Sequence, residues 1–225
     1  MAFPPSLGRI AEHDAMRRVT LHGSVIDLGG GRDSGYRTIF KGEYTTTSAN
    51  LDGHETTDIH CNLENPLPIA DASYDGVLMI NTLEHIYHCH ELVNESFRIM
   101  KHNGVVVIAV PFLFPVHPSP SDFWRFTAET LHNLLRDAGY TEIEITPLAP
   151  GVFINRFILL ERLLPQSLRV VMFYCVAPVA RFMDSVFSYM SKLLKRKYSF
   201  VVSGRVSRCC QEIRFVVQLP ICRGR

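Results

Sequence analysis

Three polar residues that could together move a proton and hold an anion lie between positions 117 and 125. His117 carries an imidazole, which can accept a proton from a hydroxyl or amine near neutral pH. Asp122 could orient that imidazole or a substrate hydroxyl, and Arg125 could pair with a carboxylate or phosphate. Trp124 offers a flat wall for an apolar or sugar face. This spacing indicates acid–base chemistry on a small polar molecule.

A second segment suited to ligand binding follows the apolar residues Val25 and Ile26. Asp27 is followed, after one leucine, by Gly29, Gly30 and Gly31. Glycine has no Cβ, so the chain can turn sharply and a ligand can approach the backbone. A loop of this kind after a strand lies at the carboxyl edge of a parallel sheet, where ligands bind. We therefore expect a small-molecule cradle here.

Apolar runs and helical stripes alternate over the first 146 residues and predict the elements that position these groups. Strands are expected at 23–28, 45–52, 57–63, 74–80, 105–110 and 141–146, and helices at 6–22, 90–102 and 127–138. Thr127 is expected to cap the last helix and Gly139 to end it, while Asn103 and Gly104 are expected to end the one before. This alternation predicts an α/β fold with a doubly wound, mostly parallel sheet.

Composition narrows the class of protein. The chain has 225 residues, 47% of them hydrophobic, which suits one α/β domain with an appendage. The formal net charge of +1 gives no basic field, so we expect no nucleic-acid partner. The six cysteines show no framework spacing and the N-terminus shows no apolar leader, which together predict a cytoplasmic protein with reduced thiols.

The segment after Pro147 has a different character. Residues 151–197 read as an apolar helical appendage interrupted by arginines, and its apolar runs fall short of the roughly 20 residues that a membrane span needs. The basic run Lys192–Lys197 closes it. Two interpretations stay open: a helical cap over the active site, or a helix lying on an anionic bilayer surface. We expect domain boundaries at 1–150, 151–197 and 198–225, with strands in the last part completing the sheet.

Several spaced motifs together resemble one enzyme family over about residues 20–146. They are Asp27–Gly31, Asp52, Asn62–Pro68, Tyr74–Val77, Leu83–Ile86, Arg98–Gly104, and a stretch between Pro111 and Thr127 similar to "PF…H..P.DYWRYT". The ordered set resembles the class I S-adenosylmethionine-dependent methyltransferases, and more narrowly their type 11 branch. The resemblance implies a Rossmann-like fold with a seven-stranded sheet, S-adenosylmethionine as cofactor, and a small-molecule acceptor.

The resemblance also implies roles for individual residues. The cofactor-binding set is expected to be Asp27, Gly29, Gly30, Gly31, Asp52, Asn62, Leu63 and Asn81. In this set Asp27 would accept from the cofactor's amino group, and Asp52 would hold the ribose diol. Asn62 and Leu63 would contact adenine. Asn81 would lie near the transferring methyl. His117 as base and Asp122 form the expected catalytic pair. His85, Trp124 and Arg125 are expected to contact the acceptor, a sugar, glycan or lipid-linked intermediate. Methylation at oxygen is favoured over methylation at nitrogen.

Three departures from the family pattern keep alternatives open. Asp33 stands where a further glycine is usual, Asn62 replaces an aspartate, and His102–Gly104 replaces the usual PGG. A methyltransferase-like binding or scaffold protein without catalysis therefore remains a hypothesis. An NAD-dependent oxidoreductase is less favoured, because Ser34 occupies the position of the third fingerprint glycine.

No metal site is expected from the sequence. His85, His88, Cys89 and His90 lie close together, but they are joined by no further ligand at a known spacing. The oligomeric state is not indicated by any pattern in the chain.

Overall fold

The computed structural model describes residues 7–51, 57–112, 114–148, 164–165, 168, 171–195 and 213–217. They divide into two compact units, one built mainly on residues 13–146 and the other mainly on the segment after Pro147. The expected ribose ligand Asp52 lies outside the described residues. The predicted domain boundaries remain predictions.

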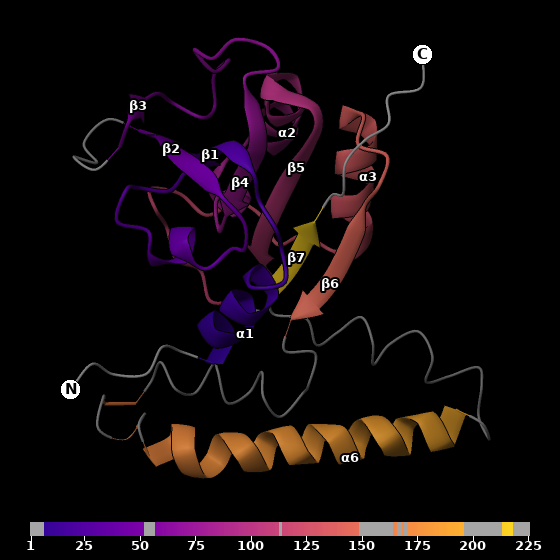
Figure 1. Ribbon diagram of the computed structural model, residues 1–225. Helices are drawn as coiled ribbons and strands as arrows, with labels where there is room; N and C mark the ends of the chain where they lie inside the picture. The colour runs from indigo at the N-terminus through magenta and orange to yellow at the C-terminus, as the bar shows by residue number, and fades with distance from the viewer. Residues whose placement is uncertain are drawn as a thin grey trace. The chain divides into compact units, whose positions relative to one another are not determined.

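A mostly parallel sheet forms the framework of the first unit (Figure 1). Its strands are β1 (Gly23–Leu28), β2 (Tyr44–Asn50), β3 (Ile59–His60), β4 (Tyr74–Ile80), β5 (Met100–Pro111), β6 (Glu144–Leu148) and β7 (Ile213–Val217), in the order β3-β2-β1-β4-β5-β7-β6. The registers from β3 to β5 are all parallel, and Ile26 of β1 pairs with both Thr47 and Val77. The predicted doubly wound parallel arrangement is therefore confirmed.

Helices connect these strands as the sequence pattern predicts. The helices of this part are α1 (Leu7–Met16), α2 (Cys89–Ile99) and α3 (Ala128–Ala138), with short 3-10 turns η1 (Gly35–Thr38) and η2 (Leu83–His85). At the start of α3 the Thr127 hydroxyl accepts from the Thr130 amide, and Gly139 ends the helix with a left-handed φ of 107°. Both predicted caps are confirmed.

The hydrophobic core lies along the central strands β1, β4 and β5. Ile26, Val77 and Ile108 are completely buried, because these strands are covered on both faces. Burying one such side chain contributes roughly 1.5–3 kcal/mol, so the centre of the sheet is the most stable part of the unit. The ends of β1, β4 and β5 are thus held on a rigid support.

Some predicted boundaries were wrong. The helix expected to reach residue 102 ends at Ile99, because Met100 is already extended and pairs with Tyr74 as the first residue of β5. Asn103 and Gly104 consequently lie inside a strand with an irregular register rather than at a helix end. The first helix ends at Met16 rather than at residue 22, and the strand expected over 57–63 covers only two residues.

The second unit contains a π-helical turn, η3 (Met172–Val176), which leads into α6 (Ala177–Lys195). Among the described residues, no helix has the length and apolar character needed to cross a membrane. Most of the expected appendage before residue 164 and the strand expected near 198–202 lie outside the described residues.

Candidate active site

The loops after β1, β4 and β5 meet at one edge of the sheet. Because these strands are parallel, their carboxyl ends lie together, which brings the glycine loop, residues 81–85 and residues 111–125 to the same side. Asn81 begins the second of these loops with a left-handed φ of 53°, and its amide donates to Ala109. An asparagine tolerates this conformation better than most residues, so the chain can turn sharply at the end of β4.

The glycine loop is shaped by contacts with its own neighbours. Gly29 has a φ of 92° and its amide donates to Ala49 at the end of β2. A Cβ at Gly29 would collide with the Thr82 side chain, and one at Gly30 would collide with the Asp27 carboxylate. These two glycines are therefore required by the packing of the loop itself, whether or not a ligand is bound.

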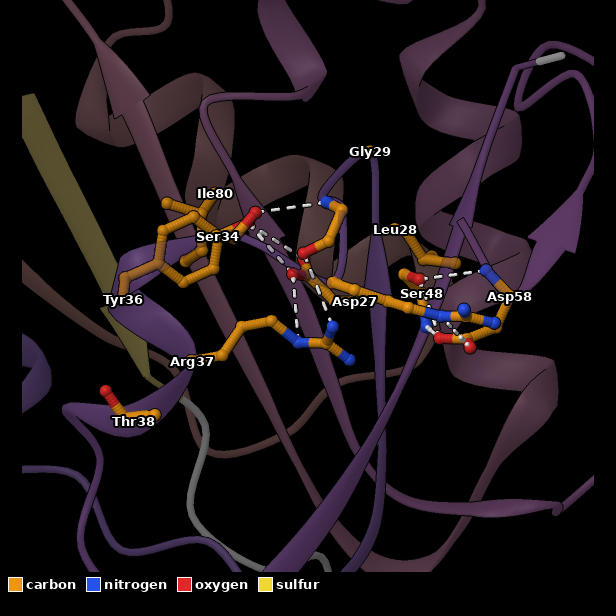
Figure 2. Close-up of polar contacts among 12 residues, drawn as sticks. Asp27, Leu28, Gly29, Ser34, Tyr36, Arg37, Thr38, Ser48, Asp58 and Ile80 are labelled. Carbon is orange, nitrogen blue, oxygen red and sulfur yellow. Dashed lines mark hydrogen bonds and ion pairs between the residues drawn. The ribbon is translucent and has the colours of Figure 1, made fainter. Parts of the chain in front are cut away.

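Asp27 lies at the end of β1, as predicted, but it is completely buried. The Tyr36 hydroxyl donates to both carboxylate oxygens at 2.9 and 3.1 Å, and Arg37 Nε lies 3.9 Å away (Figure 2). Burial raises the pKa of Asp27 to about 7, although the Tyr36 hydrogen bond and the Arg37 charge oppose that rise. Contact between Asp27 and a cofactor amino group remains a prediction. It would require the Tyr36 hydroxyl to give up its hydrogen bond to at least one of the two carboxylate oxygens.

Arg37 is a candidate site residue that no motif in the sequence pointed to. Its side chain is only 7% exposed, and Nη1 donates to the Gly31 carbonyl at 3.3 Å. Among the described residues, neither Nε nor Nη2 has a hydrogen-bond partner. Arg37 lines a cavity of about 450 Å³ together with Ser34 and Tyr44. The Nε and Nη2 atoms are themselves covered by the protein, and a ligand that reached them from this cavity would meet a cation suited to an anionic group.

The two residues expected to contact adenine, Asn62 and Leu63, follow β3 in the chain. Asn62 is exposed, and its side-chain carbonyl accepts from the Glu64 amide in a local turn. Leu63 is buried in the hydrophobic core. Their roles toward adenine remain predictions. Asn50 at the end of β2, which the sequence analysis did not single out, donates from Nδ2 to the Gly29 carbonyl at 2.8 Å and joins the two strand ends.

A charged bridge ties the glycine loop to the strands beside it. Arg32 Nε donates to Asp58 at 2.6 Å. The other oxygen of Asp58 accepts from the amide and hydroxyl of Ser48 (Figure 2). These hydrogen bonds, first those from Ser48, lower the pKa of Asp58 to about 2. Arg32 is largely exposed, so the bridge orients the loop more than it stabilises the fold.

The predicted His117–Asp122 pair is present. His117 Nδ1 lies 3.2 Å from Asp122 Oδ2, and the His117 amide donates to the same oxygen at 2.8 Å. Two nitrogens of Arg125 donate to Asp122 at 2.5 and 2.7 Å. These bonds hold the pKa of Asp122 well below its usual range. Arg125 is engaged with Asp122, and its expected contact with an anionic acceptor remains a prediction.

Glu84 and His85 of η2 lie against this pair. Glu84 is completely buried, and its Oε1 lies 3.8 Å from His85 Nε2 and 4.0 Å from His117 Nε2. The backbone carbonyl of Glu84 accepts from the amides of Phe123 and Trp124 at 2.7 and 3.3 Å. These bonds fasten residues 121–124 to η2. The "LEH" pattern is visible in the sequence, but nothing in that pattern assigns a role to Glu84.

Three exposed aromatic side chains lie next to the histidines. Tyr87, Phe123 and Trp124 are 56%, 46% and 39% exposed. The Tyr87 ring lies 5.3 Å from that of Phe123 and 6.2 Å from that of Trp124, while Trp124 Nε1 donates to the Ile86 carbonyl. Phe126 is instead buried. We call Tyr87, Phe123 and Trp124 the aromatic patch.

Comparison with known proteins agrees with this architecture. Residues 40–108 match the family model described as a methyltransferase domain. A probable S-adenosylmethionine-dependent methyltransferase of Mycolicibacterium smegmatis is 32% identical over 93 residues. That alignment covers 39% of this chain and only 35% of the relative's length.

Solved structures show the same fold. Phosphoethanolamine N-methyltransferase 2 of Haemonchus contortus, in complex with S-adenosylmethionine, has a TM-score of 0.56 at 16% identity, covering 94% of this chain and 52% of that one. A methyltransferase of Archaeoglobus fulgidus has a TM-score of 0.53 at 13% identity, covering 94% and 92%. The chain therefore has the Rossmann-like fold of these methyltransferases. The matches agree with the resemblance to the class I S-adenosylmethionine-dependent methyltransferases found in the sequence.

Proposed function

We propose that this protein transfers the methyl group of S-adenosylmethionine to a hydroxyl of a small-molecule acceptor. The matched methyltransferase domain and the glycine loop at the carboxyl edge of the sheet support the cofactor. The observation that carries the reaction type is the His117–Asp122 pair. His117 Nδ1 lies 3.2 Å from the Asp122 carboxylate, which can only accept, and a proton on Nδ1 leaves Nε2 as the nitrogen that takes a proton from the acceptor.

The reaction requires little chemistry from the protein beyond alignment and proton removal. The acceptor oxygen attacks the methyl carbon, the carbon–sulfur bond breaks, and the electron pair remains on sulfur. His117 takes the hydroxyl proton. Holding oxygen, carbon and sulfur in line can supply roughly 7–11 kcal/mol of the barrier reduction. The residues that we propose for the cofactor are those predicted above, with Arg37 as a further partner for its carboxylate.

The aromatic patch supports a sugar or glycan acceptor. Sugar rings present apolar faces of C–H groups that pack on exposed aromatic rings, while their hydroxyls remain available for methylation. Tyr87, Phe123 and Trp124 offer such a surface. The amides of Phe123 and Trp124 are bound to Glu84, whose carboxylate lies 4.0 Å from His117 Nε2. A phosphorylated or lipid-linked sugar fits the same surface.

The direct test is methyl transfer itself. The purified chain is incubated with labelled S-adenosylmethionine and a panel of free, phosphorylated and lipid-linked sugars, and methylated products are detected by mass spectrometry. Trp124→Ala should raise KM for the acceptor at least tenfold, whereas Tyr174→Ala, an exposed aromatic residue of the other unit, should not. No methylated product with any acceptor, despite cofactor binding, would refute this function.

The closed surroundings of Asp27 favour a second candidate, a binding protein that has lost catalysis. Tyr36 already occupies both oxygens of the carboxylate. Titration calorimetry separates the two candidates: the enzyme binds S-adenosylmethionine and loses that binding in Gly29→Arg. The scaffold shows no heat at millimolar cofactor.

We further propose that the segment 151–197 lies on an anionic membrane surface. Val179, Phe182, Met183 and Val186 follow one another at helical spacing along α6, and all four are exposed. Basic residues follow in the sequence from Lys192. Flotation with anionic vesicles, but not with neutral ones, is expected, and Phe182→Glu should weaken it. A chain that ignores both kinds of vesicle would contradict the proposal.

A further inference from the structure

Three potential metal ligands converge at the junction of η2 and the segment after β5. Glu84, His85 and His117 each offer one ligand atom, and these atoms all lie within 4.8 Å of one another. Glu84 is completely buried, while the side chains of His85 and His117 are 12% and 29% exposed. We propose that this trio binds a divalent transition-metal ion such as Zn²⁺. The ligands come from segments more than thirty residues apart in the sequence, so no short ligand motif in the sequence predicts the site.

The hydrogen bonds of the two imidazoles fix which nitrogens face the cluster. His85 Nδ1 bonds to the Ser121 carbonyl, which can only accept, so Nδ1 carries the proton. His117 Nδ1 lies against the Asp122 carboxylate, which also accepts. In both neutral rings the lone pair is therefore on Nε2, the atom that lies 3.8 or 4.0 Å from Glu84 Oε1.

This arrangement is the one that metal-binding histidines usually show. A histidine that ligates through one ring nitrogen generally donates from the other to a carboxylate or a backbone carbonyl, which fixes the ring and raises its basicity. His117 has the carboxylate partner and His85 has the carbonyl partner. Two imidazoles and one carboxylate form a ligand set that suits Zn²⁺ and related ions, with coordination positions left for water or a substrate oxygen.

The geometry is close to a metal site without matching one already. Ligand bonds near 2.0–2.1 Å in a tetrahedron place ligand atoms roughly 3.3 Å apart, so the three atoms would approach one another by about 0.5–1.5 Å. Small rotations of the side chains achieve this. The nearby Arg125 guanidinium also interacts with Glu84, but both of its terminal nitrogens already donate to Asp122.

The proposal does not depend on methyl transfer, because metal binding is measured on the protein alone. A metal ion on His117 Nε2 would use the lone pair that the proposed function gives to the acceptor proton. His117 Nε2 can therefore bind the metal ion or accept the proton, but not both at once.

The experiment uses the full chain, stripped with a chelator and titrated with Co²⁺ under an optical readout, with Zn²⁺ as competitor. We expect one ion per chain, bound through nitrogen and oxygen without the charge-transfer bands of a thiolate. Glu84→Gln and His85→Gln should each weaken binding at least tenfold. His90→Gln, which removes an exposed histidine six residues along the chain from Glu84, should leave binding unchanged.

Because a buried substitution such as Glu84→Gln can impair folding, the wild-type protein supplies a second readout. Nitrogen-15 spectra of the imidazoles during Zn²⁺ titration should show metal-bound Nε2 on two histidines, both with protonated Nδ1. Absence of binding, binding equal in wild type and His85→Gln, or spectra that place the ion on other histidines would overturn the proposal.

Discussion

Two buried carboxylates at the same sheet edge have opposite surroundings. Asp27 lies against one phenol and a guanidinium 3.9 Å away, and burial raises its pKa to about 7. Asp122 receives two direct hydrogen bonds from Arg125 and one from the His117 backbone, and its pKa is held low. Both side chains are nearly inaccessible to solvent. Burial is the main cause of the raised pKa of Asp27, whereas the hydrogen bonds from Arg125 are the main cause of the lowered pKa of Asp122.

The two carboxylates therefore mark two different regions. The region around Asp122 has its charges paired within the protein, whereas the region around Asp27 is suited to receive a ligand. The charge of Asp122 is satisfied by the protein itself, so the acceptor side is organised before any substrate arrives. The charge of Asp27 is poorly satisfied, so a cation that enters beside it gains an unusually strong partner. The amino group of S-adenosylmethionine is the cation that the proposed function supplies.

The largest effect is expected from Asp122→Asn. The neutral amide cannot neutralise the charge of Arg125, and its NH₂ group can face His117 Nδ1 with a donor in place of an acceptor. His117 would then remove the proton from the acceptor more slowly. General-base catalysis commonly contributes about 10²–10⁴-fold, and we expect kcat to fall by at least about 10². KM for the cofactor should change little, which initial rates at varied cofactor will show.

A matched control for that variant is Asp137→Asn, which removes an exposed acid paired with Arg136. It should retain full activity. Equal kcat values for Asp122→Asn and wild type would show that the preformed pair has no role in the reaction.

The next largest effect is expected from Gly29→Ala. The left-handed backbone and the Thr82 side chain both oppose a Cβ there, so the free energy of unfolding should fall by about 1–3 kcal/mol. Gly35→Ala is the control, because nothing lies within 4 Å of a Cβ at that position and it should change stability by less than about 0.5 kcal/mol. Urea unfolding measures both, and equal losses would contradict the packing argument.

A smaller effect concerns pH. At pH values between 3.8 and about 7, Asp27 keeps its proton in the folded chain but has lost it in the unfolded chain. The contribution of Asp27 to stability is therefore largest at low pH and is lost as pH rises toward 7. Cofactor affinity should behave in the opposite way, because a cationic amino group prefers the ionised acid.

Calorimetry at several pH values checks this expectation. Affinity for S-adenosylmethionine should rise between about pH 6 and pH 8 and level off above the pKa of Asp27. Asp27→Asn should flatten the profile. A profile of the same shape in that variant would mean that another group governs binding.

The smallest effect is expected from Tyr36→Phe. It removes one hydrogen bond to a buried acid, which costs roughly 0.5–1.5 kcal/mol of unfolding free energy, and the pKa of Asp27 should rise further. Carbon-13 spectra of the carboxyl group follow that titration. Tyr44→Phe also loses one hydrogen bond, to the Arg37 carbonyl, yet should leave the Asp27 midpoint in place.

Much of the fold follows from local patterns in the chain. The apolar runs of β1, β4 and β5 and the caps at Thr127 and Gly139 were all predictable, because each depends on neighbours in the sequence. The contact between His117 and Asp122 was predictable for the same reason. The end of α2 was not, because pairing of Met100 with Tyr74 outweighed the helix-ending signal of Asn103.

The parts of the site that were missed depend on distant neighbours. Tyr36 and Arg37 become candidate site residues only because η1 folds back and brings both side chains to Asp27. Glu84 meets His117 only because β4 and β5 are adjacent in the sheet. No spacing in a single chain reveals which loops will face each other across a strand end.

The attachment of residues 121–124 to η2 relies on main-chain atoms. The Glu84 carbonyl accepts from two backbone amides, and a backbone amide is the same whatever side chain it bears. Natural variation or laboratory selection can therefore replace the rings at positions 123 and 124 without releasing the loop that holds His117. Acceptor preference can change here while the proton-handling residues stay in register.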